Sequence, residues 1–387
     1  MSEKLLVPKI RFKEFTNAWE QWKVGDLLTE RLEFSKQTID FPLMAFIANE
    51  GITPKGKRYD RSSLVKDAEN KIYKVTKYGD FIYSSNNLDR GSIGSNKYGN
   101  ACISPVYSVF RTTNLSNSQF IEKALCRNEL IDKILRYRQG VVYGQLKIHE
   151  SAFLNINLSS PTLPEQNKIG RLLANLDSLI TLHQRKLSIL KNLKNRLLDR
   201  MFCDEKSQFP SIRFKEFTNA WEQEKLGNLV DIFSGKLDTK DAKPNGTYNF
   251  YTCGYEIYKI DSYAFEGEGI TISGSGSTVG NLHLADGKYN ANQRTYVIQN
   301  IKIPRYYIYS YMTNNFISYC ERSSKSSGIP NIDTNTIFNF VLPITNVEEQ
   351  SKISSLFSHL DSLIALHQRK LNSLKNIKNT LLEKMFV

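Results

Sequence analysis

One run of twelve residues occurs twice in this chain. The run IRFKEFTNAWEQ lies at residues 10–21 and returns without a change at residues 212–223. A second pair of matching segments lies at 165–202 and 349–386, where 25 of 38 positions are identical. Internal repeats of this kind show that one structural unit has been duplicated. The chain is therefore organised as a head, a variable segment and a long repeat, in two copies.

The two segments between the heads and the long repeats are dissimilar. Residues 23–162 and 225–346 show almost no similarity, and the second segment is 18 residues shorter, the difference between the repeat offsets of 202 and 184. Repeated segments that flank dissimilar inserts indicate two copies of one fold whose inserts have different roles.

Each long repeat has the apolar spacing of a helix. In the first repeat, apolar residues recur at seven-residue steps in three neighbouring rows. Three rows make an apolar face that is wider than a strict coiled-coil seam. We expect one continuous helix about 55 Å long from each repeat. The rows are Ile169, Leu176, Leu190 and Leu197; Leu172, Leu179 and Leu193; and Leu173, Ile180, Leu187 and Met201.

The two helices are predicted to pair with each other as an antiparallel coiled coil, because a solitary helix would leave its wide apolar face in water. His183 and His367 occupy equivalent positions in the apolar rows. We interpret them as half-buried polar residues that fix the register of the pair, with a ligand role as the alternative.

Capping signals mark where the helices begin. Thr162 with Glu165, and Asn346 with Glu349, have the spacing of a capping box. The predicted domains follow from these signals. They are residues 1–162 with the first head and first variable segment, 163–204 with the first helix, 205–345 with the linker, second head and second variable segment, and 346–387 with the second helix.

The variable segments are typical of α/β domains. Short β-rich runs such as DFIYSS at residues 80–85 alternate with turn residues, and a helical stretch is expected at about 118–137. The second segment follows the same order, with a helix expected at about 305–319. The fold class is therefore α/β (α+β), with two such domains, two long helices and a pseudo-two-fold internal repeat.

Charge favours a polyanionic partner. Lys and Arg number 52 against 39 Asp and Glu, which gives a net charge of +13, and a basic chain of this kind is typical of nucleic-acid binding. Basic and amide side chains on loops can contact phosphates and base edges, although for each of them a role in solubility or packing remains the alternative. The candidate DNA-binding residues are Arg90, Lys97, Arg136, Arg138, Tyr143, Gln145 and Lys147 in the first segment, and Ser275, Ser277, Arg322, Lys325 and Asn331 in the second.

The sequence carries no catalytic or metal-binding motif that we recognise. The stretch SGSGSTVG at residues 273–280 lacks the lysine of a phosphate-binding loop and is predicted to be a turn between strands. Five scattered cysteines without CxxC spacing are expected to be reduced and structural. No apolar run is long enough to cross a membrane and no signal peptide is evident, so we expect a cytoplasmic, non-catalytic protein without a membrane partner.

The joint pattern resembles the specificity subunit of type I restriction-modification systems. The features that carry the resemblance are the repeated IRFKEFTNAWEQ, the PTLPEQNKI entry to the first long helix at residues 161–169, the LDSLI and LHQRKL cores of both helices and the two dissimilar inserts. The resemblance covers the whole chain.

This resemblance implies two target-recognition domains that each read one half of a bipartite site in double-stranded DNA, with the paired helices as a spacer. It also implies two modification subunits that methylate adenine with S-adenosylmethionine, and restriction subunits, which are motor-nucleases that use ATP with Mg²⁺. No cofactor is expected in this chain itself. The alternative is a non-catalytic coiled-coil scaffold without DNA specificity, which would offer no reason for the inserts to diverge.

Overall fold

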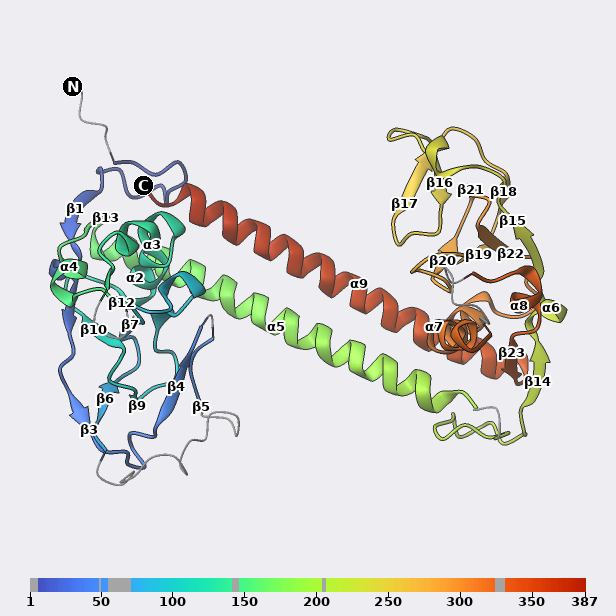
Figure 1. The fold of residues 1–387 in the computed structure, drawn as a ribbon, viewed down its shortest axis with the longest axis horizontal. Helices are drawn as coiled ribbons and strands as arrows, with labels where there is room; N and C mark the ends of the chain where they lie inside the picture. The colour runs from blue at the N-terminus through green and yellow to red at the C-terminus, as the bar shows by residue number, and fades with distance from the viewer. Residues whose placement is uncertain (1–5, 49, 55–70, 141–145, 204–206, 324–330) are drawn as a thin grey trace. The chain divides into compact units, whose positions relative to one another are not determined.

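The computed structural model describes residues 6–48, 50–54, 71–140, 146–203, 207–323 and 331–387 (Figure 1). The chain forms two compact units. Unit 1 consists of residues 1–182 and 370–387, and unit 2 consists of residues 183–369. Each unit contains one head, one variable segment and part of each long helix. The α/β fold class and the internal repeat are confirmed.

The centre of unit 1 is an antiparallel four-stranded sheet in the order β2-β10-β7-β8. Its inner face packs Phe81, Tyr83 and Phe110 against Phe153. The described elements before the first long helix are β1 (Glu20–Lys23), α1 (Val24–Leu27), β2 (Leu28–Glu30), β3 (Phe34–Ser35), β4 (Met44–Ile47), β5 (Gly51–Pro54), β6 (Tyr73–Thr76), β7 (Phe81–Tyr83), β8 (Ile93–Ser95), β9 (Ala101–Ile103), β10 (Ser108–Thr112), α2 (Ser118–Leu125), α3 (Asn128–Leu135), β11 (Gln139–Gly140), β12 (Leu146–Lys147), α4 (Glu150–Leu154) and β13 (Asn157–Ser160).

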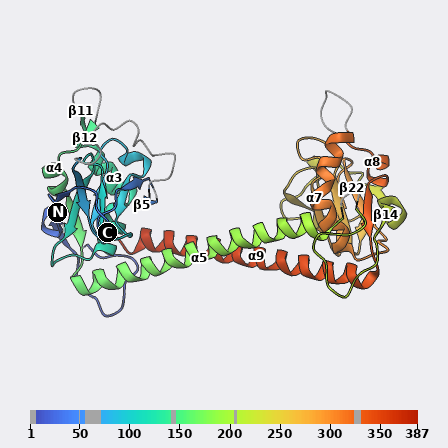
Figure 2. The ribbon, with the colours of Figure 1, turned by 90° about the horizontal axis from the view of Figure 1, so that it is seen from below.

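Unit 2 repeats this plan. Its sheet β15-β22-β19-β20 has the same strand arrangement, and α7 contacts the strands β19 and β20 of this sheet (Figure 2). A second four-stranded sheet has the order β17-β16-β21-β18. The described elements are β14 (Glu222–Lys225), α6 (Leu226–Leu229), β15 (Asp231–Ser234), β16 (Tyr248–Tyr251), β17 (Ile257–Ile260), β18 (Phe265–Glu266), β19 (Gly269–Ser273), β20 (Leu282–Ala285), β21 (Lys288–Ala291), β22 (Thr295–Gln299), α7 (Arg305–Ser323), α8 (Thr334–Phe338) and β23 (Val341–Ile344).

The helical stretch expected at about 118–137 is confirmed, and the structure divides it into two helices, α2 and α3. Arg127 separates them with an extended backbone (ψ 140°). Its guanidinium lies 5.2 Å from the centre of the Phe386 ring. An extended residue at the N-cap of α3 thus separates the two helices.

The long helices are α5 (Leu163–Met201) and α9 (Val347–Lys384), and they are antiparallel within each unit. In unit 1, Lys378 Nζ on α9 lies 2.6 Å from Asp177 Oδ1 on α5. In unit 2, Lys194 Nζ on α5 lies 2.6 Å from Asp361 Oδ1 on α9. As the residue number on α5 rises, that of its partner on α9 falls, so the predicted antiparallel pairing is confirmed.

The two equivalent histidines meet in unit 2. His183 Nδ1 lies 2.8 Å from His367 Nδ1, and both side chains are half-buried. At this distance the two rings share a hydrogen bond, and the tautomer decides which ring donates it. Because the contact joins equivalent positions of the two helices, it supports the interpretation that these residues fix the register.

The described part of the chain has no helix long and apolar enough to span a membrane. All five cysteines are free thiols. Burial raises the pKa of the Cys126 thiol to about 12, which keeps it protonated and suits a packing role.

Candidate nucleic-acid interface

The loop that follows β7 in unit 1 has a counterpart after β19 in unit 2. Ser84 N–H donates to Ser92 O at 2.9 Å in the first loop, and Ser273 N–H donates to Asn281 O at 2.9 Å in the second. The residue before each acceptor is a left-handed glycine, Gly91 with φ 86° and Gly280 with φ 81°. The SGSGSTVG stretch is thus a turn between strands, as predicted, and the two loops share one backbone plan.

In each unit, the segment just before a short helix contacts this loop. The helix is α4 in unit 1 and α8 in unit 2. In unit 1, Ile148 N–H donates to Ser85 Oγ at 3.0 Å. In unit 2, Ile332 N–H donates to Gly274 O at 2.9 Å. Because these contacts are equivalent, Lys147 and Asn331 occupy matching positions, and both are exposed.

The end of α3 completes the cluster in unit 1. Arg138 Nη2 lies 3.3 Å from Asp89 Oδ1 and so ties the residues after α3 to the loop. The hydrogen bond from Arg138 holds the pKa of Asp89 below its usual value. Arg90 and Arg136 are exposed and form no ion pair with a described carboxylate. Four predicted residues, including Lys147, thus lie on three adjoining segments.

In unit 2, α7 takes the place of α3. A Cβ on Gly280 would lie 3.2 Å from Ile317 Cγ1, so this helix borders the loop. Ser275 pairs with Asn331 in an isolated β-bridge. Ser277, which lies between Ser275 and Gly280 in the sequence, is exposed. Arg322 is exposed near the end of α7.

The other predicted residues do not join these clusters in the structure. Lys97 Nζ lies 2.8 Å from Glu122 Oε1 on α2, whereas Lys147 Nζ has a longer contact of 3.8 Å with Glu150 Oε2. Tyr143, Gln145 and Lys325 lie outside the described residues.

Arg294 is a candidate that the sequence analysis missed. Its carbonyl oxygen accepts hydrogen bonds from Gly274 N–H at 2.8 Å and from the Cys253 thiol at 2.9 Å, so its backbone is fixed against the loop. Its side chain is exposed and has no ion pair with the described residues. A Cβ on Gly274 would lie 2.6 Å from Arg294 O, which explains the glycine. The only sequence signal is the polar run NANQR before β22.

Cys253 shares this loop cluster. Burial raises the pKa of its thiol, but hydrogen bonds from Ser275, from Ser273 and from the loop backbone outweigh burial and lower it below the usual value. These hydrogen bonds tie the segment after β16 to the loop after β19.

Exposed donors on loops that a sheet holds in place can contact phosphates and base edges. No group of three metal ligands occurs in the described part of the chain.

The side chain of Asn346 caps its helix as expected, whereas the carboxylates of Glu165 and Glu349 have partners other than those of a capping box. At the start of α9, Asn346 Oδ1 accepts from Glu349 N–H at 2.8 Å. At the start of α5, the Thr162 carbonyl oxygen accepts from Glu165 N–H at 3.0 Å. The two buried glutamate carboxylates do not complete capping boxes, because half-buried arginines of the heads bind them instead. The predicted role of these carboxylates is corrected accordingly.

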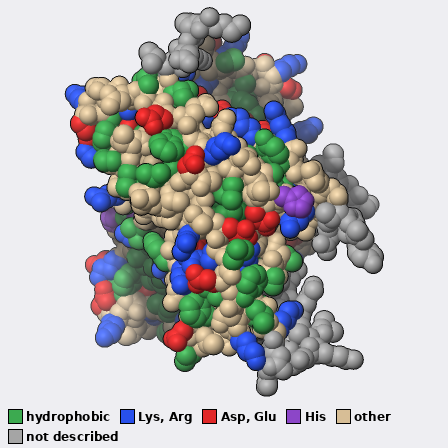
Figure 3. Space-filling view, turned by 90° about the vertical axis from the view of Figure 1, so that its left-hand side faces the viewer, with side chains coloured by type: hydrophobic (Ala, Val, Ile, Leu, Met, Phe, Trp, Pro, Cys, Tyr) green, Lys and Arg blue, Asp and Glu red, His purple; other side chains and the backbone are tan. Residues whose placement is uncertain are grey.

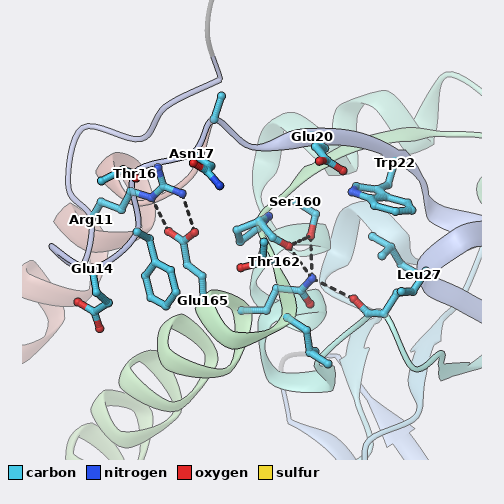
Figure 4. Close-up of a pocket in the computed structure, with 16 residues that line it drawn as sticks. Arg11, Glu14, Thr16, Asn17, Glu20, Trp22, Leu27, Ser160, Thr162 and Glu165 are labelled. Atoms are coloured by element: carbon cyan, nitrogen blue, oxygen red, sulfur yellow. Dashed lines mark hydrogen bonds and ion pairs between the residues drawn. The ribbon is translucent and has the colours of Figure 1, made fainter.

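Those arginines attach each head to a helix start. Arg11 contacts both carboxylate oxygens of Glu165 at 2.7 and 2.8 Å (Figure 4). Arg213 contacts Glu349 with the same distances. The hydrogen bond with Glu165 raises the pKa of Arg11. Beside the first of these pairs lies a cavity of about 260 Å³, lined by Thr16, Asn17, Glu20, Trp22 and Ser160 among others.

The face drawn in Figure 3 carries Lys and Arg side chains intermixed with Asp, Glu and apolar side chains. The excess positive charge is not gathered into one patch on this face.

Comparison with known proteins agrees with this architecture. The family model of the type I restriction modification DNA specificity domain matches residues 17–192 and again residues 219–376. A solved S subunit of a type I restriction-modification system from M. genitalium has a similar fold, with a TM-score of 0.69 and 17% identity over 98% of this chain and 99% of that one.

Two curated relatives are similar in sequence. The specificity subunit of the type I restriction enzyme EcoDI from Escherichia coli is 33% identical over 145 residues, which are 38% of this chain and 31% of that subunit. The MjaVIII specificity subunit from Methanocaldococcus jannaschii is 21% identical over 303 residues, 66% of this chain and 70% of its own length. Because the family model matches most of the sequence in two successive copies, this chain belongs to the type I restriction modification DNA specificity domain family.

Proposed function

We propose that this chain is the non-catalytic subunit that recognises a bipartite target in double-stranded DNA and directs adenine methylation and restriction by its partner subunits. The observation that carries the proposal is the pair of loop clusters. The two clusters share a backbone plan, yet one presents Arg90, Arg136 and Lys147 while the other presents Ser277, Arg294 and Asn331. Two domains that recognise different base sequences need the same backbone arrangement with different hydrogen-bonding side chains.

Each unit would read one half-site, and the paired helices would set the gap between the half-sites, as dimer geometry does in other DNA-binding proteins. Arginine suits guanine and asparagine suits adenine in the major groove. The remaining candidates, Arg138, Ser275 and Arg322, with Tyr143, Gln145 and Lys325, would position the backbone or contact bases in the same clusters.

The partners in this proposal are two modification subunits and the restriction subunits. Support comes from apolar side chains that remain exposed at matching positions of both helices. Leu179 and Leu363 are each 43% exposed, and Leu182 and Leu366 are 45% and 38% exposed. An apolar stripe that repeats in this way fits an amphipathic helix from each of two copies of one partner. S-adenosylmethionine, ATP and Mg²⁺ would bind to those partners, and the assembly would work in the cytoplasm.

Selection from a random DNA library tests the proposal. The chain is purified with its modification subunit, and bound duplexes are recovered and sequenced. We expect one motif with two specified parts and a fixed gap. A scaffold without DNA specificity would return the composition of the input library, and that result would reject the proposal.

A further inference from the structure

The hairpin formed by β16 and β17 in unit 2 (Figure 1) ends in an exposed aromatic side chain. Residues 252–256 connect the two strands, and within this connection Tyr255 is 71% exposed, the largest exposed fraction of any tyrosine in the described part of the chain. Its ring and hydroxyl form no ring contact or hydrogen bond with the described residues. Packing within the chain therefore does not require an aromatic residue at this position.

Hydrogen bonds hold this connection against the DNA-binding candidates of unit 2. The Cys253 carbonyl oxygen accepts from Ser273 Oγ at 3.0 Å and from the hydroxyl of Thr278 in the loop after β19. The Cys253 thiol donates to Arg294 O at 2.9 Å. Tyr255 thus follows, by two residues, a backbone that is fixed between this loop and Arg294. A side chain on a backbone that is already ordered binds at a lower entropic cost.

The corresponding hairpin of unit 1, formed by β4 and β5, lacks the tyrosine. β16 pairs in parallel with β21, the strand before β22, and Leu43 beside β4 pairs in parallel with Cys102 in β9, the strand before β10. Because β10 and β22 hold the same place in their sheets, the two hairpins are equivalent. The connection in unit 1 has the sequence Ala-Asn-Glu at residues 48–50. The aromatic side chain is therefore a property of one unit and not of the shared fold.

The surroundings of Tyr255 suit base edges better than phosphates. Glu256, the next residue, is exposed. Its carboxylate is repelled by the phosphate backbone but can accept a hydrogen bond from the amino group of cytosine. In the major groove the base edges carry donors, acceptors and a single kind of apolar group, the C5-methyl group of thymine. An exposed ring beside hydrogen-bonding side chains such as Arg294 has that methyl group as its apolar partner in the groove.

We infer that Tyr255 is a specificity-determining residue that recognises a thymine by packing its ring on the C5-methyl group in the half-site read by unit 2. This inference rests on the proposed function and adds one identified base contact to it. The contact removes the methyl group and part of the ring from water, so it is favourable without the tyrosine hydroxyl. The half-site of unit 2 should accordingly contain an A·T base pair.

Replacing thymine by deoxyuridine in the target tests the inference, because this change removes the methyl group and keeps every hydrogen-bonding group of the base. The target is first identified by selection from a random DNA library. Each thymine of the motif is then replaced in turn, and the affinity of each duplex for the complex of the full chain with its modification subunit is measured. We expect binding to weaken about fourfold at one thymine, since burial of one methyl group contributes about 0.8 kcal/mol and about 1.4 kcal/mol corresponds to tenfold.

Variants of the chain assign this effect to Tyr255. Y255A should bind the thymine and deoxyuridine duplexes with equal affinity, whereas Y255F should keep the fourfold difference because it retains the ring. Y263A is the matched control. Tyr263 is also exposed, but it lies at the opposite end of the same sheet, where its ring centre is 5.2 Å from that of Tyr248. Y263A should therefore keep the fourfold difference.

The possible outcomes separate this inference from the proposed function. If no thymine of the motif can be replaced with a loss of affinity, or if Y255A keeps the same fourfold difference as the wild type, Tyr255 does not recognise a thymine methyl group. A general loss of affinity in Y255A without a change in the response to deoxyuridine would also overturn the inference, because the ring would then make a different contact. If the wild-type complex selects no motif at all, the proposed function itself fails.

Discussion

At the scale of single residues, the buried arginine–glutamate pairs should dominate the stability of the head attachment. Glu165 is 1% exposed and Glu349 is fully buried, so replacing Arg11 or Arg213 by Met leaves a buried carboxylate without its partner. We expect R11M and R213M each to lower the free energy of unfolding by about 3–5 kcal/mol, measured by chemical denaturation.

The double variant R11M/E165L is the control for this prediction. Replacing both charges by apolar groups should recover most of the lost stability, because the buried carboxylate is gone. A loss below about 1 kcal/mol in R11M would contradict the account, since that is the range of an exposed ion pair.

Arg294 should determine part of one half-site. Its backbone is fixed by Gly274 and Cys253, so its side chain starts from a defined position. We expect R294A to relax the base preference at one position of one half-site, at a cost of about 1–3 kcal/mol in discrimination. The measurement is the methylation map of cells that carry the variant. R136A in unit 1 is the matched comparison and should affect the other half-site, and a change in the same half-site for both variants would refute the assignment.

The sequence identified only part of the candidate site at this scale. Lys147 and Asn331 are polar residues beside turns, which is a local signal, and the structure gives them equivalent positions. Arg294 was missed because its role depends on a hydrogen bond to a segment twenty residues away. Lys97 looked available because its partner, Glu122, is 25 residues away and reaches it only in the folded domain.

At the scale of elements, Asp177 joins three helices of unit 1. Lys123 Nζ on α2 and Lys378 Nζ on α9 each lie 2.6 Å from its carboxylate oxygens on α5. Burial raises the pKa of Asp177, but hydrogen bonds with the two lysines outweigh burial and lower it below the usual value. A carboxylate with a lowered pKa stabilises the fold above its unfolded pKa of about 3.9, and this contribution is lost as pH falls through the folded pKa.

D177N should therefore lower the free energy of unfolding at pH 7 by about 1 kcal/mol. The difference between variant and wild type should shrink as pH falls below about 4, because the wild-type carboxylate is then protonated as well. Denaturation curves at pH 7 and pH 3 provide the measurement. A difference that is equal at both values would show that Asp177 contributes no pH-dependent stability.

Elements with a local periodic signal were predicted well. The long helices were visible because their apolar rows recur every seven residues, and their pairing followed from the width of the apolar face. The break between α2 and α3 was not visible, because the extended N-cap at Arg127 has no local sequence signal, and its side chain contacts Phe386, a residue 259 positions further along the chain. Distant contacts of this kind leave no periodic trace in the local sequence.

At the scale of the whole molecule, the sequence repeat predicted two similar units without any assignment of helices or strands. It did not show that each unit would include parts of both long helices, so that unit 1 regains residues 370–387 after unit 2 is complete. This arrangement depends on which stretches of α5 and α9 pack on which domain, and the repeated helices themselves are too similar to reveal it.

Inserting one helical turn into either long helix should change the gap between the half-sites without changing the bases read. One turn adds about 5.4 Å, which corresponds to about one or two base pairs at 3.4 Å each. Selection from a random DNA library would report both properties at once. Altered half-sites with an unchanged gap would contradict the role of the helices as the spacer.

The central claim, that this chain supplies the DNA specificity of a modification complex, is tested most directly by mapping adenine methylation. The chain is expressed with a candidate modification subunit, and methylated adenines are located across a genome by single-molecule sequencing. The account predicts one bipartite motif with a fixed gap that disappears when this chain is omitted. Methylation at the same motif without the chain, or a stable complex that methylates without sequence preference, would contradict it.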